Sequence, residues 1–301
     1  MKTLEEILSG NPFNKDVVRQ WNRELDEFNK GEKEVGDLCF LLNEDAGKLK
    51  DDNNLHLELL PHPFMGNPNA PIWYLPLNPS YSPIDQYDNL GICPGCGLRL
   101  TQEEQQGVHV ANSCVLSSWY DRGKDKVKCL TARQKIFLKQ LTLPKDASFA
   151  FLEKEFDTLG ECPDCLDNGG YRWWNRRLFG AERSKKDFLF KSVNRSAKSM
   201  GKKLFVLEPF PYHSKIFRSR YFKSSGYFSF WAELVKWGIE NGRKFIVRST
   251  NKTFNDLVKY EGILFTRENR IGLKGQNAAL TIDNFEGEPE TIAKIKRIAS
   301  E

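Results

Sequence analysis

The segment PIWYLPLNPSYSP, residues 71–83, contains the apolar run that most clearly predicts a β-strand. The run PIWYLPL is short and continuously apolar, and it follows a stretch rich in Pro, Gly and Asn, PHPFMGNPNAP, which is typical of a loop. A short apolar run that begins after a loop and ends in polar residues indicates a buried strand. We therefore expect a strand that ends near Leu77 and leads directly into polar residues.

The second half of the chain alternates between apolar runs and amphipathic stretches. Strands are predicted in GKKLFVLEPF, RKFIVRST and GILFTR, residues 201–210, 243–250 and 262–267. Helices are predicted in YFSFWAELVKWGIENG, residues 227–242, whose final Asn-Gly is a stop signal, and in TFNDLVKYEG, residues 253–262. Alternation of this kind predicts an α/β domain with a mainly parallel sheet.

Polar residues follow each of the four predicted strands. In sheets of this class the ligand-binding crevice lies beyond the carboxyl ends of the strands. The residues expected at this edge are Asn78 to Tyr81, Glu208 to Ser214, Arg248 to Asn251 and Arg267 to Asn269. Their convergence predicts a binding or catalytic site at the carboxyl edge of the sheet.

The first 60 residues are predicted to be mostly helical. The segment DVVRQWNRELDEFNKG, residues 16–31, repeats apolar side chains at helical spacing and ends at a glycine. Residues 91–170 differ in character, because they hold two Cys-x-x-Cys pairs and mixed polar stretches. We therefore expect one α/β domain formed by residues 1–90 and 171–301, with residues 91–170 inserted into it.

Four of the seven cysteines form the two Cys-x-x-Cys pairs, Cys93 with Cys96 and Cys162 with Cys165. An odd number of cysteines in a chain without a secretory signal argues against a disulfide framework. Two such pairs suit tetrahedral Zn²⁺, and a site with four thiolate ligands is structural rather than catalytic. We therefore predict a structural zinc ion that closes the insertion. An iron–sulfur cluster is the alternative metal centre.

The net charge is +5, and basic side chains concentrate in residues 172–223, where they alternate with Trp, Phe and Tyr. Basic side chains neutralise phosphates and aromatic rings stack on unpaired bases, so this composition suits a nucleic-acid partner. A solvated basic face with aromatic core residues explains the composition equally well. No transmembrane run and no signal peptide are visible, so we predict a cytoplasmic protein without a membrane partner or an evident obligate protein partner.

The segment IWYLPLNPSYSP resembles the first motif of the uracil-DNA glycosylase superfamily. There a strand ends in Gly-Ile-Asn-Pro-Gly in the mismatch-specific branch, or in Gly-Gln-Asp-Pro-Tyr in the classical branch. Residues 77–80, Leu-Asn-Pro-Ser, match the former type, with Pro76 where glycine is usual. PHPFMGNPNAP and the later LEPFPYHSK look like segments of a diverged bacterial branch. The resemblance implies a three-layer α/β/α fold with a central, mainly parallel four-stranded sheet.

The resemblance also implies roles for the residues around this motif. Asn78 would position the attacking water, since an amide is too weak a base to deprotonate it. Asp85 or Asp88, a few residues downstream, could supply the missing carboxylate. Tyr81 would shape the pocket beside the base, and Pro79 and Ser80 would line it. Turn formation by Asn78 and Pro79, and packing by Tyr81, are the alternative roles.

The segment after the second predicted strand supplies the base-binding candidates. Glu208 stands where classical members place an Asn that recognises uracil, and a carboxylate there would accept from the exocyclic amine of cytosine. His213 would donate to the departing base or contact a phosphate, with a structural role as the alternative. Phe210 and Tyr212 would stack on an extruded base, with core packing as the alternative. The remaining substrate-binding candidates are Ser214, Arg248, Asn269 and Asn277.

The superfamily's late His-Pro-Ser loop has no clear copy in RENRIGLKGQNAALT, residues 267–281, which disfavours ordinary uracil-DNA activity. Some members of the wider superfamily remove heavily modified cytosines in anti-phage defence. We therefore predict a monofunctional DNA glycosylase that flips and removes a cytosine-derived base, such as glucosylated hydroxymethylcytosine, from phage or other modified DNA. The alternatives are a non-catalytic zinc-containing nucleic-acid-binding protein, a conventional uracil-DNA glycosylase and a hydrolase of free nucleosides.

Overall fold

A computed structural model gives the fold of most of the predicted α/β domain. The structure describes residues 2–77, 187–190, 203–216, 218, 220–248, 255, 258–259, 261–274 and 279–301. The predicted insertion at residues 91–170, with both Cys-x-x-Cys pairs, lies outside these residues, and so do residues 78–83. The insertion and its boundaries therefore stay predictions.

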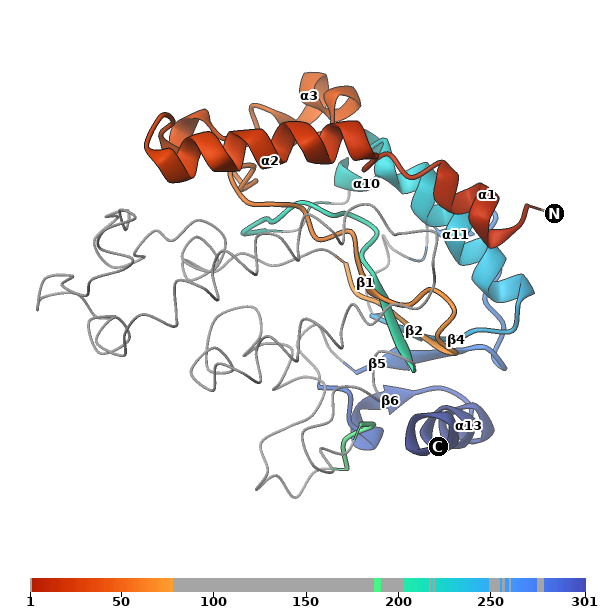
Figure 1. Ribbon diagram of the computed structural model, residues 1–301. Coiled ribbons are helices and arrows are strands. Elements are labelled where there is room, and N and C mark those ends of the chain that lie inside the picture. Colours follow the sequence, from red (N-terminus) through yellow and green to blue (C-terminus); the bar gives the residue numbers. More distant parts are fainter. Residues whose placement is uncertain are drawn as a thin grey trace, which may run out of the picture.

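A six-stranded sheet lies at the centre of the described structure, in the order β1-β3-β2-β4-β5-β6 (Figure 1). The strands are β1 (Phe64–Gly66), β2 (Ile72–Leu75), β3 (Leu204–Leu207), β4 (Lys244–Val247), β5 (Arg270–Leu273) and β6 (Phe285–Glu286). The four inner strands pair in parallel, whereas β1 and β6 pair antiparallel at the two edges. The α/β class is confirmed. The sheet has more strands than expected because the short β1 and β6 extend it on both sides.

β2 lies between β3 and β4, and both of its faces are covered. Ile72 and Tyr74 belong to the core on one face, and Trp73 and Leu75 belong to the core on the other. All four side chains are at most 3% exposed. A parallel strand that is buried on both faces needs an apolar side chain at every position, which explains the continuous run that predicts this strand.

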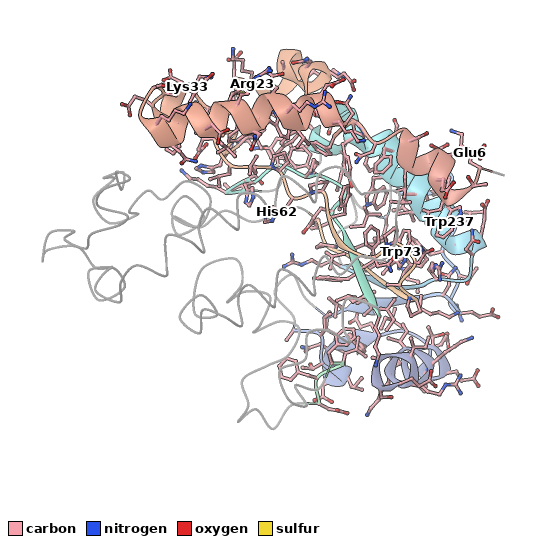
Figure 2. All side chains as sticks on the ribbon, viewed as in Figure 1. Glu6, Arg23, Lys33, His62, Trp73 and Trp237 are labelled. Atoms are coloured by element: carbon pink, nitrogen blue, oxygen red, sulfur yellow. The ribbon has the colours of Figure 1, made fainter. Side chains whose placement is uncertain are left out.

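In the described part of the chain, helices cover one side of the sheet (Figure 1). They are α1 (Leu4–Ser9), α2 (Lys15–Lys30), α3 (Asn43–Leu49), α10 (Arg220–Ser224) and α11 (Tyr227–Glu240), with a short 3₁₀ helix, η1 (Val35–Asp37), between α2 and α3. α11 approaches the strands closely at Gly238, where a Cβ would lie 3.1 Å from Phe245 and 3.2 Å from Trp73. Trp237 stacks beside Trp73, with ring centroids 6.3 Å apart (Figure 2).

The opposite side of the sheet is covered by α13 (Pro289–Ser300), as Figure 1 shows. Ile295 and Ala299 of this helix are buried in one cluster with Ile72 and Ile271 of the sheet. A 3₁₀ helix, η4 (Ile282–Asn284), precedes β6. Helices therefore cover both faces of the parallel strands, as their apolar character on both faces requires.

The two long helices predicted from amphipathic spacing are confirmed as α2 and α11. The side chain of Asn14 accepts from the backbone N–H groups of Asp16 and Val17 at the start of α2, and Gly31, with φ of 84°, ends the helix. Residues 255, 258 and 259, within the third predicted helix, are helical. Within the described ranges, none of the helices combines the length and the apolar surface that a bilayer-spanning segment requires.

The strand predicted at residues 262–267 is wrong. The chain turns at Gly262, whose φ is 67°, and Leu264 is 74% exposed. The parallel partner of β4 is β5, in which Ile271 pairs with Ile246. The sequence RIGL conceals this strand because arginine and glycine interrupt its apolar pattern. The correction moves residues 267–269 from the carboxyl end of a strand to the amino end of β5.

Candidate functional site

The carboxyl ends of β2, β3 and β4 lie side by side, and Glu208 and Arg248 follow β3 and β4. Because β2 is the middle strand, these two residues flank the point from which the chain continues toward Asn78. The backbone N–H of Arg248 donates to the carbonyl of Leu75 at 3.2 Å, and that of Glu208 donates to the carbonyl of Pro63 at 2.8 Å. A glutamate and an arginine are thereby held at the edge where parallel sheets bind ligands.

The Glu208 side chain is buried at this edge and only 5% exposed. Its Oε2 atom makes no hydrogen bond to any described residue. Burial raises the pKa of Glu208 well above its usual range, and the positive charge of Arg248 acts in the opposite direction. We therefore expect Glu208 to keep its proton to a higher pH than an exposed glutamate does.

Tyr227, the first residue of α11, lies close to Glu208 and is fully buried. Burial, and then the charge of Glu208, raise the pKa of Tyr227 well above its usual range. Its hydroxyl donates to the carbonyl of Pro63 at 3.1 Å, so that this carbonyl accepts from both Tyr227 and the N–H of Glu208. The contact ties the start of α11 to the end of β3 and fixes the backbone of the glutamate.

Two histidines meet where the segment before β1 pairs with the segment after β3. The rings of His62 and His213 lie edge to face with centroids 5.0 Å apart. The backbone N–H of His62 donates to the carbonyl of Pro211 at 2.8 Å, and the backbone N–H of His56 donates to the carbonyl of His213 at 3.0 Å. Burial, and then the charge of His213, lower the pKa of His62 well below its usual range, so its imidazole is neutral at neutral pH. Figure 2 shows His62 between the N-terminal helices and β1.

The sequence indicates His213 as a site residue but gives little signal for His62 or Tyr227. His62 stands between two prolines in a stretch that is typical of a loop. Tyr227 begins an amphipathic helix in which every aromatic residue is a core candidate. The place of His62 between two prolines, directly before a strand that approaches the site, is the one local feature that suggests a special role.

Phe210 and Tyr212 are core residues, which corrects the expectation that they stack on a base. Both are at most 1% exposed. Phe210 stacks on Tyr221 of α10 with ring centroids 4.8 Å apart, and the hydroxyl of Tyr212 accepts from the backbone N–H of Leu42. The helical layer covers both rings, so neither ring is accessible for stacking on a base. Ser214 is also buried and forms an isolated β-bridge with Leu55.

Asp45 is a buried acid that the sequence does not reveal, because a carboxylate in the first turn of a helix is normally exposed. It accepts from the hydroxyls of Tyr212 and Ser225 at 2.5 and 3.2 Å, and from the N–H of Gly226 at 2.7 Å. Three donors satisfy a buried carboxyl group well. Asp45 therefore joins α3, the start of α11 and the segment that carries Glu208, and it helps to position the candidate site.

Asn269 lies at the opposite edge of the sheet from Glu208, so its expected place at the carboxyl edge is wrong. Its carbonyl accepts from the N–H of Phe245, near the start of β4, at 2.7 Å. Its side-chain Oδ1 accepts from the N–H of Thr266 at 3.0 Å. Asn269 therefore shapes the turn before β5. The error follows directly from the misplaced fourth strand.

The other predicted site residues lie outside the described residues. They are Asn78, Pro79, Ser80, Tyr81, Asp85, Asn277, Cys93, Cys96, Cys162 and Cys165. Within the described part of the chain, no group of three or more His, Cys, Asp and Glu side chains is arranged to hold a metal ion. The zinc prediction therefore depends on the sequence alone.

A hollow of about 500 Å³ lies on the helical side of the molecule. Its walls include Gly10, Glu44, Ser229 and Glu233, which come from the end of α1, from α3 and from α11. Neither Glu208 nor any other residue at the carboxyl edge of the sheet lines it. The hollow is therefore separate from the candidate site.

Comparisons with protein-family models, with curated proteins and with solved structures found no match for this chain. The resemblance of residues 72–83 to the uracil-DNA glycosylase superfamily therefore stays a prediction from the sequence. The described geometry adds an independent observation, which is a buried acid at the carboxyl edge of a parallel sheet.

Proposed function

We propose that the chain is a monofunctional DNA glycosylase that hydrolyses the N-glycosidic bond of an extruded, cytosine-derived base and leaves an abasic site. The observation that carries the proposal is the buried Glu208 carboxyl group beside the end of β2. A buried titratable group with a displaced pKa at the ligand-binding edge of a sheet is typical of a functional site. The segment that continues from β2, residues 77–80, is the one that resembles the superfamily's water-positioning motif.

The reaction makes particular demands on the residues around the base. Cleavage develops positive charge on the sugar and negative charge on the departing base, and water must approach the opposite face of the sugar. Asn78 would hold that water, as the resemblance implies. A protonated Glu208 would donate a hydrogen bond to the departing base and so stabilise its negative charge. His213, which is buried in the following segment, is a second candidate donor.

Exposed cations directly after His213 support a DNA partner. Lys215 and Arg218 are exposed, and so is Arg220, which forms an ion pair with Asp52. Cations beside a base-binding site neutralise the phosphates on either side of the extruded nucleotide. Base extrusion is required in any case, because the reacting bond is otherwise inaccessible inside a duplex.

Three further parts of the proposal rest on the sequence and on the resemblance. Cys93, Cys96, Cys162 and Cys165 hold a structural zinc ion in the insertion. The biological role is removal of modified bases from phage DNA. The protein acts in the cytoplasm without an obligate protein partner.

Abasic-site formation tests the proposed reaction. The substrates are single-stranded and duplex oligonucleotides with one hydroxymethylcytosine, one glucosylated hydroxymethylcytosine or one uracil, and alkali cleaves the abasic product. We expect release of a modified cytosine by the wild type and a rate at least about 100-fold lower for Asn78→Ala, with DNA binding retained. Asn69→Ala, at an exposed position before β2, is the matched control and should act like the wild type. DNA binding without release of any base would favour the non-catalytic nucleic-acid-binding protein instead.

A further inference from the structure

One oxygen of the Glu208 side chain is buried and makes no hydrogen bond within the described part of the chain. Most buried polar atoms in proteins have a partner, and leaving one unsatisfied lowers stability. Where the exception lies at the ligand-binding edge of a sheet, a ligand is the natural missing partner. A ligand bound at this edge would therefore supply the missing hydrogen-bond partner of Glu208 Oε2.

Two donors near the end of β3 are committed to backbone carbonyls. Tyr227 gives its hydroxyl proton to the carbonyl of Pro63 at 3.1 Å. The indole N–H of Trp231 donates to the carbonyl of Leu207 at 3.4 Å. Arg248 acts on Glu208 through its charge. The arrangement fixes the backbone of Glu208 and leaves Oε2 unsatisfied.

We propose that Glu208 binds the hydrogen-bonding edge of the extruded pyrimidine as a paired donor and acceptor. One carboxyl oxygen accepts from the exocyclic amine of a cytosine-type base, and the other, as a hydroxyl, donates to the adjacent ring nitrogen. The inference rests on the proposed function, because it takes the ligand to be a base. It replaces the sequence-based expectation of a carboxylate that only accepts.

The proton on Glu208 makes this recognition depend on pH. Burial raises the pKa of Glu208, and Arg248, which follows β4, opposes the shift. Tyr227 of α11 also lies near Glu208, and its own raised pKa keeps it neutral. If Glu208 is ionised, its second oxygen is also an acceptor and cannot donate to the ring nitrogen, which is itself an acceptor. The two lone pairs then repel each other. Binding of the base therefore weakens as the pH rises through the pKa of Glu208.

The proposed contact tolerates some base modifications and not others. A substituent at C5, such as a glucosylated hydroxymethyl group, leaves the amine and the ring nitrogen unchanged. Replacement of both amine hydrogens by methyl groups removes the donor and should abolish the contact. Uracil can pair with the same acid if the proton sits on the other oxygen, so any preference for cytosine over uracil comes from other residues.

Equilibrium binding of a single-stranded oligonucleotide with one glucosylated hydroxymethylcytosine tests the inference between about pH 6 and about pH 9. We expect the affinity of the wild type to fall as the pH rises. At the acid end, Glu208→Ala should bind about 5- to 150-fold more weakly than the wild type. Glu208→Gln, whose amide also offers a donor and an acceptor, should lose less affinity and show no dependence on pH. Glu240→Gln, at an exposed position of α11, is the matched control and should behave like the wild type.

Two binding results would overturn the inference. One is equal affinity for Glu208→Ala and the wild type, and the other is an affinity of Glu208→Gln as low as that of Glu208→Ala. Infrared difference spectra give a second readout that needs no catalysis. The wild type at neutral pH should show a protonated-carboxyl band that Glu208→Gln lacks and that shifts when the oligonucleotide binds. Absence of the band would also contradict the proposal.

The inference and the proposed function can fail separately. If no base is released but binding and infrared spectra follow the expected pattern, the inference holds and the chain recognises bases without excising them. If a modified cytosine is released while both Glu208 variants bind it like the wild type, the glycosylase proposal holds and the inference fails.

Discussion

The hydroxyl of Tyr212 donates a hydrogen bond to the carboxyl group of Asp45 over 2.5 Å, and both side chains are buried. The bond joins the segment after β3 to α3, and Asp45 also accepts from the N–H of Gly226 at the start of α11. The position of the segment from Glu208 to His213 therefore depends on a polar contact with the helical layer.

Removal of the Tyr212 hydroxyl should destabilise the protein. Tyr212→Phe leaves the buried Asp45 with one donor fewer, so we expect the free energy of unfolding to fall by about 1–3 kcal/mol. Chemical denaturation measures the change. Glu44→Gln, at the exposed neighbour of Asp45, is the matched control and should change stability by less than about 0.5 kcal/mol. A Tyr212→Phe variant as stable as that control would contradict the account of Asp45.

Substitution of Gly238 tests the close packing of α11 on the sheet. A Cβ at this position would lie 3.1 Å from the Phe245 ring and 3.2 Å from Trp73. Gly238→Ala should therefore lower the free energy of unfolding by about 1–3 kcal/mol, although alanine favours the helix. At Gly47 of α3 an added Cβ meets nothing within 4 Å, so Gly47→Ala should be neutral or stabilising by up to about 1 kcal/mol. Equal effects of the two substitutions on thermal denaturation would disprove the packing argument.

His62 should make stability depend on pH. Because its pKa in the folded protein lies well below the ordinary value of 6.5, the unfolded chain binds a proton below that pH that the folded chain does not bind. The contribution of His62 to the free energy of unfolding is therefore fully present above about pH 6.5. It is lost as the pH falls, by at most about 1.4 kcal/mol per pH unit. Urea denaturation of His62→Gln should show a shallower loss on the acid side. An unchanged slope would mean that His62 titrates normally in the folded protein.

Glu208 should make stability depend on pH in the direction opposite to His62. Its pKa is raised above the ordinary value of 4.5, so the folded protein keeps a proton that the unfolded chain releases. This contribution is complete below about pH 4.5 and is lost as the pH rises toward the pKa of folded Glu208. Glu208→Gln should therefore gain stability relative to the wild type as the pH rises from about 5 to about 8 in the same urea experiment. A constant difference between the two proteins across that range would show that Glu208 is not perturbed.

Metal analysis tests the predicted zinc centre in the insertion. Purified protein should contain about one zinc ion per chain, and Cys93→Ser or Cys162→Ser should lose it, since each removes one of four ligands. Cys39→Ser is the control and should keep the metal, because the Cys39 thiol lies outside the two Cys-x-x-Cys pairs. A zinc content well below one per chain, or a brown chromophore, would contradict the prediction.

Local sequence patterns predicted the parts of the fold that depend on local chemistry. β2 and α11 follow from a continuous apolar run and from helical spacing, and both lie where expected. β5 is not predictable from its own residues, RIGL, because they alternate charge and glycine with apolar side chains and the strand forms by pairing with β4. Asn269 was consequently assigned to the wrong edge of the sheet.

The rest of the candidate site could not be predicted from the sequence, because it depends on contacts between residues that are far apart along the chain. Phe210 and Tyr212 look available after a strand until residues 42–45 and α10 are seen to cover them. His62 becomes a partner of His213 only because the segment before β1 pairs with the segment after β3. The sequence placed Glu208 at the strand end, but its protonation depends on burial that only the folded chain provides.

Mass spectrometry of the bases released from DNA tests the central proposal most directly. The substrates are phage DNA with glucosylated hydroxymethylcytosine, the same DNA without modification, and uracil-containing DNA. We predict that the wild type releases the modified cytosine and that Asn78→Ala releases none. Release of uracil without modified cytosine would contradict the proposed substrate, and release of no base from any of the three DNAs would contradict the proposed activity.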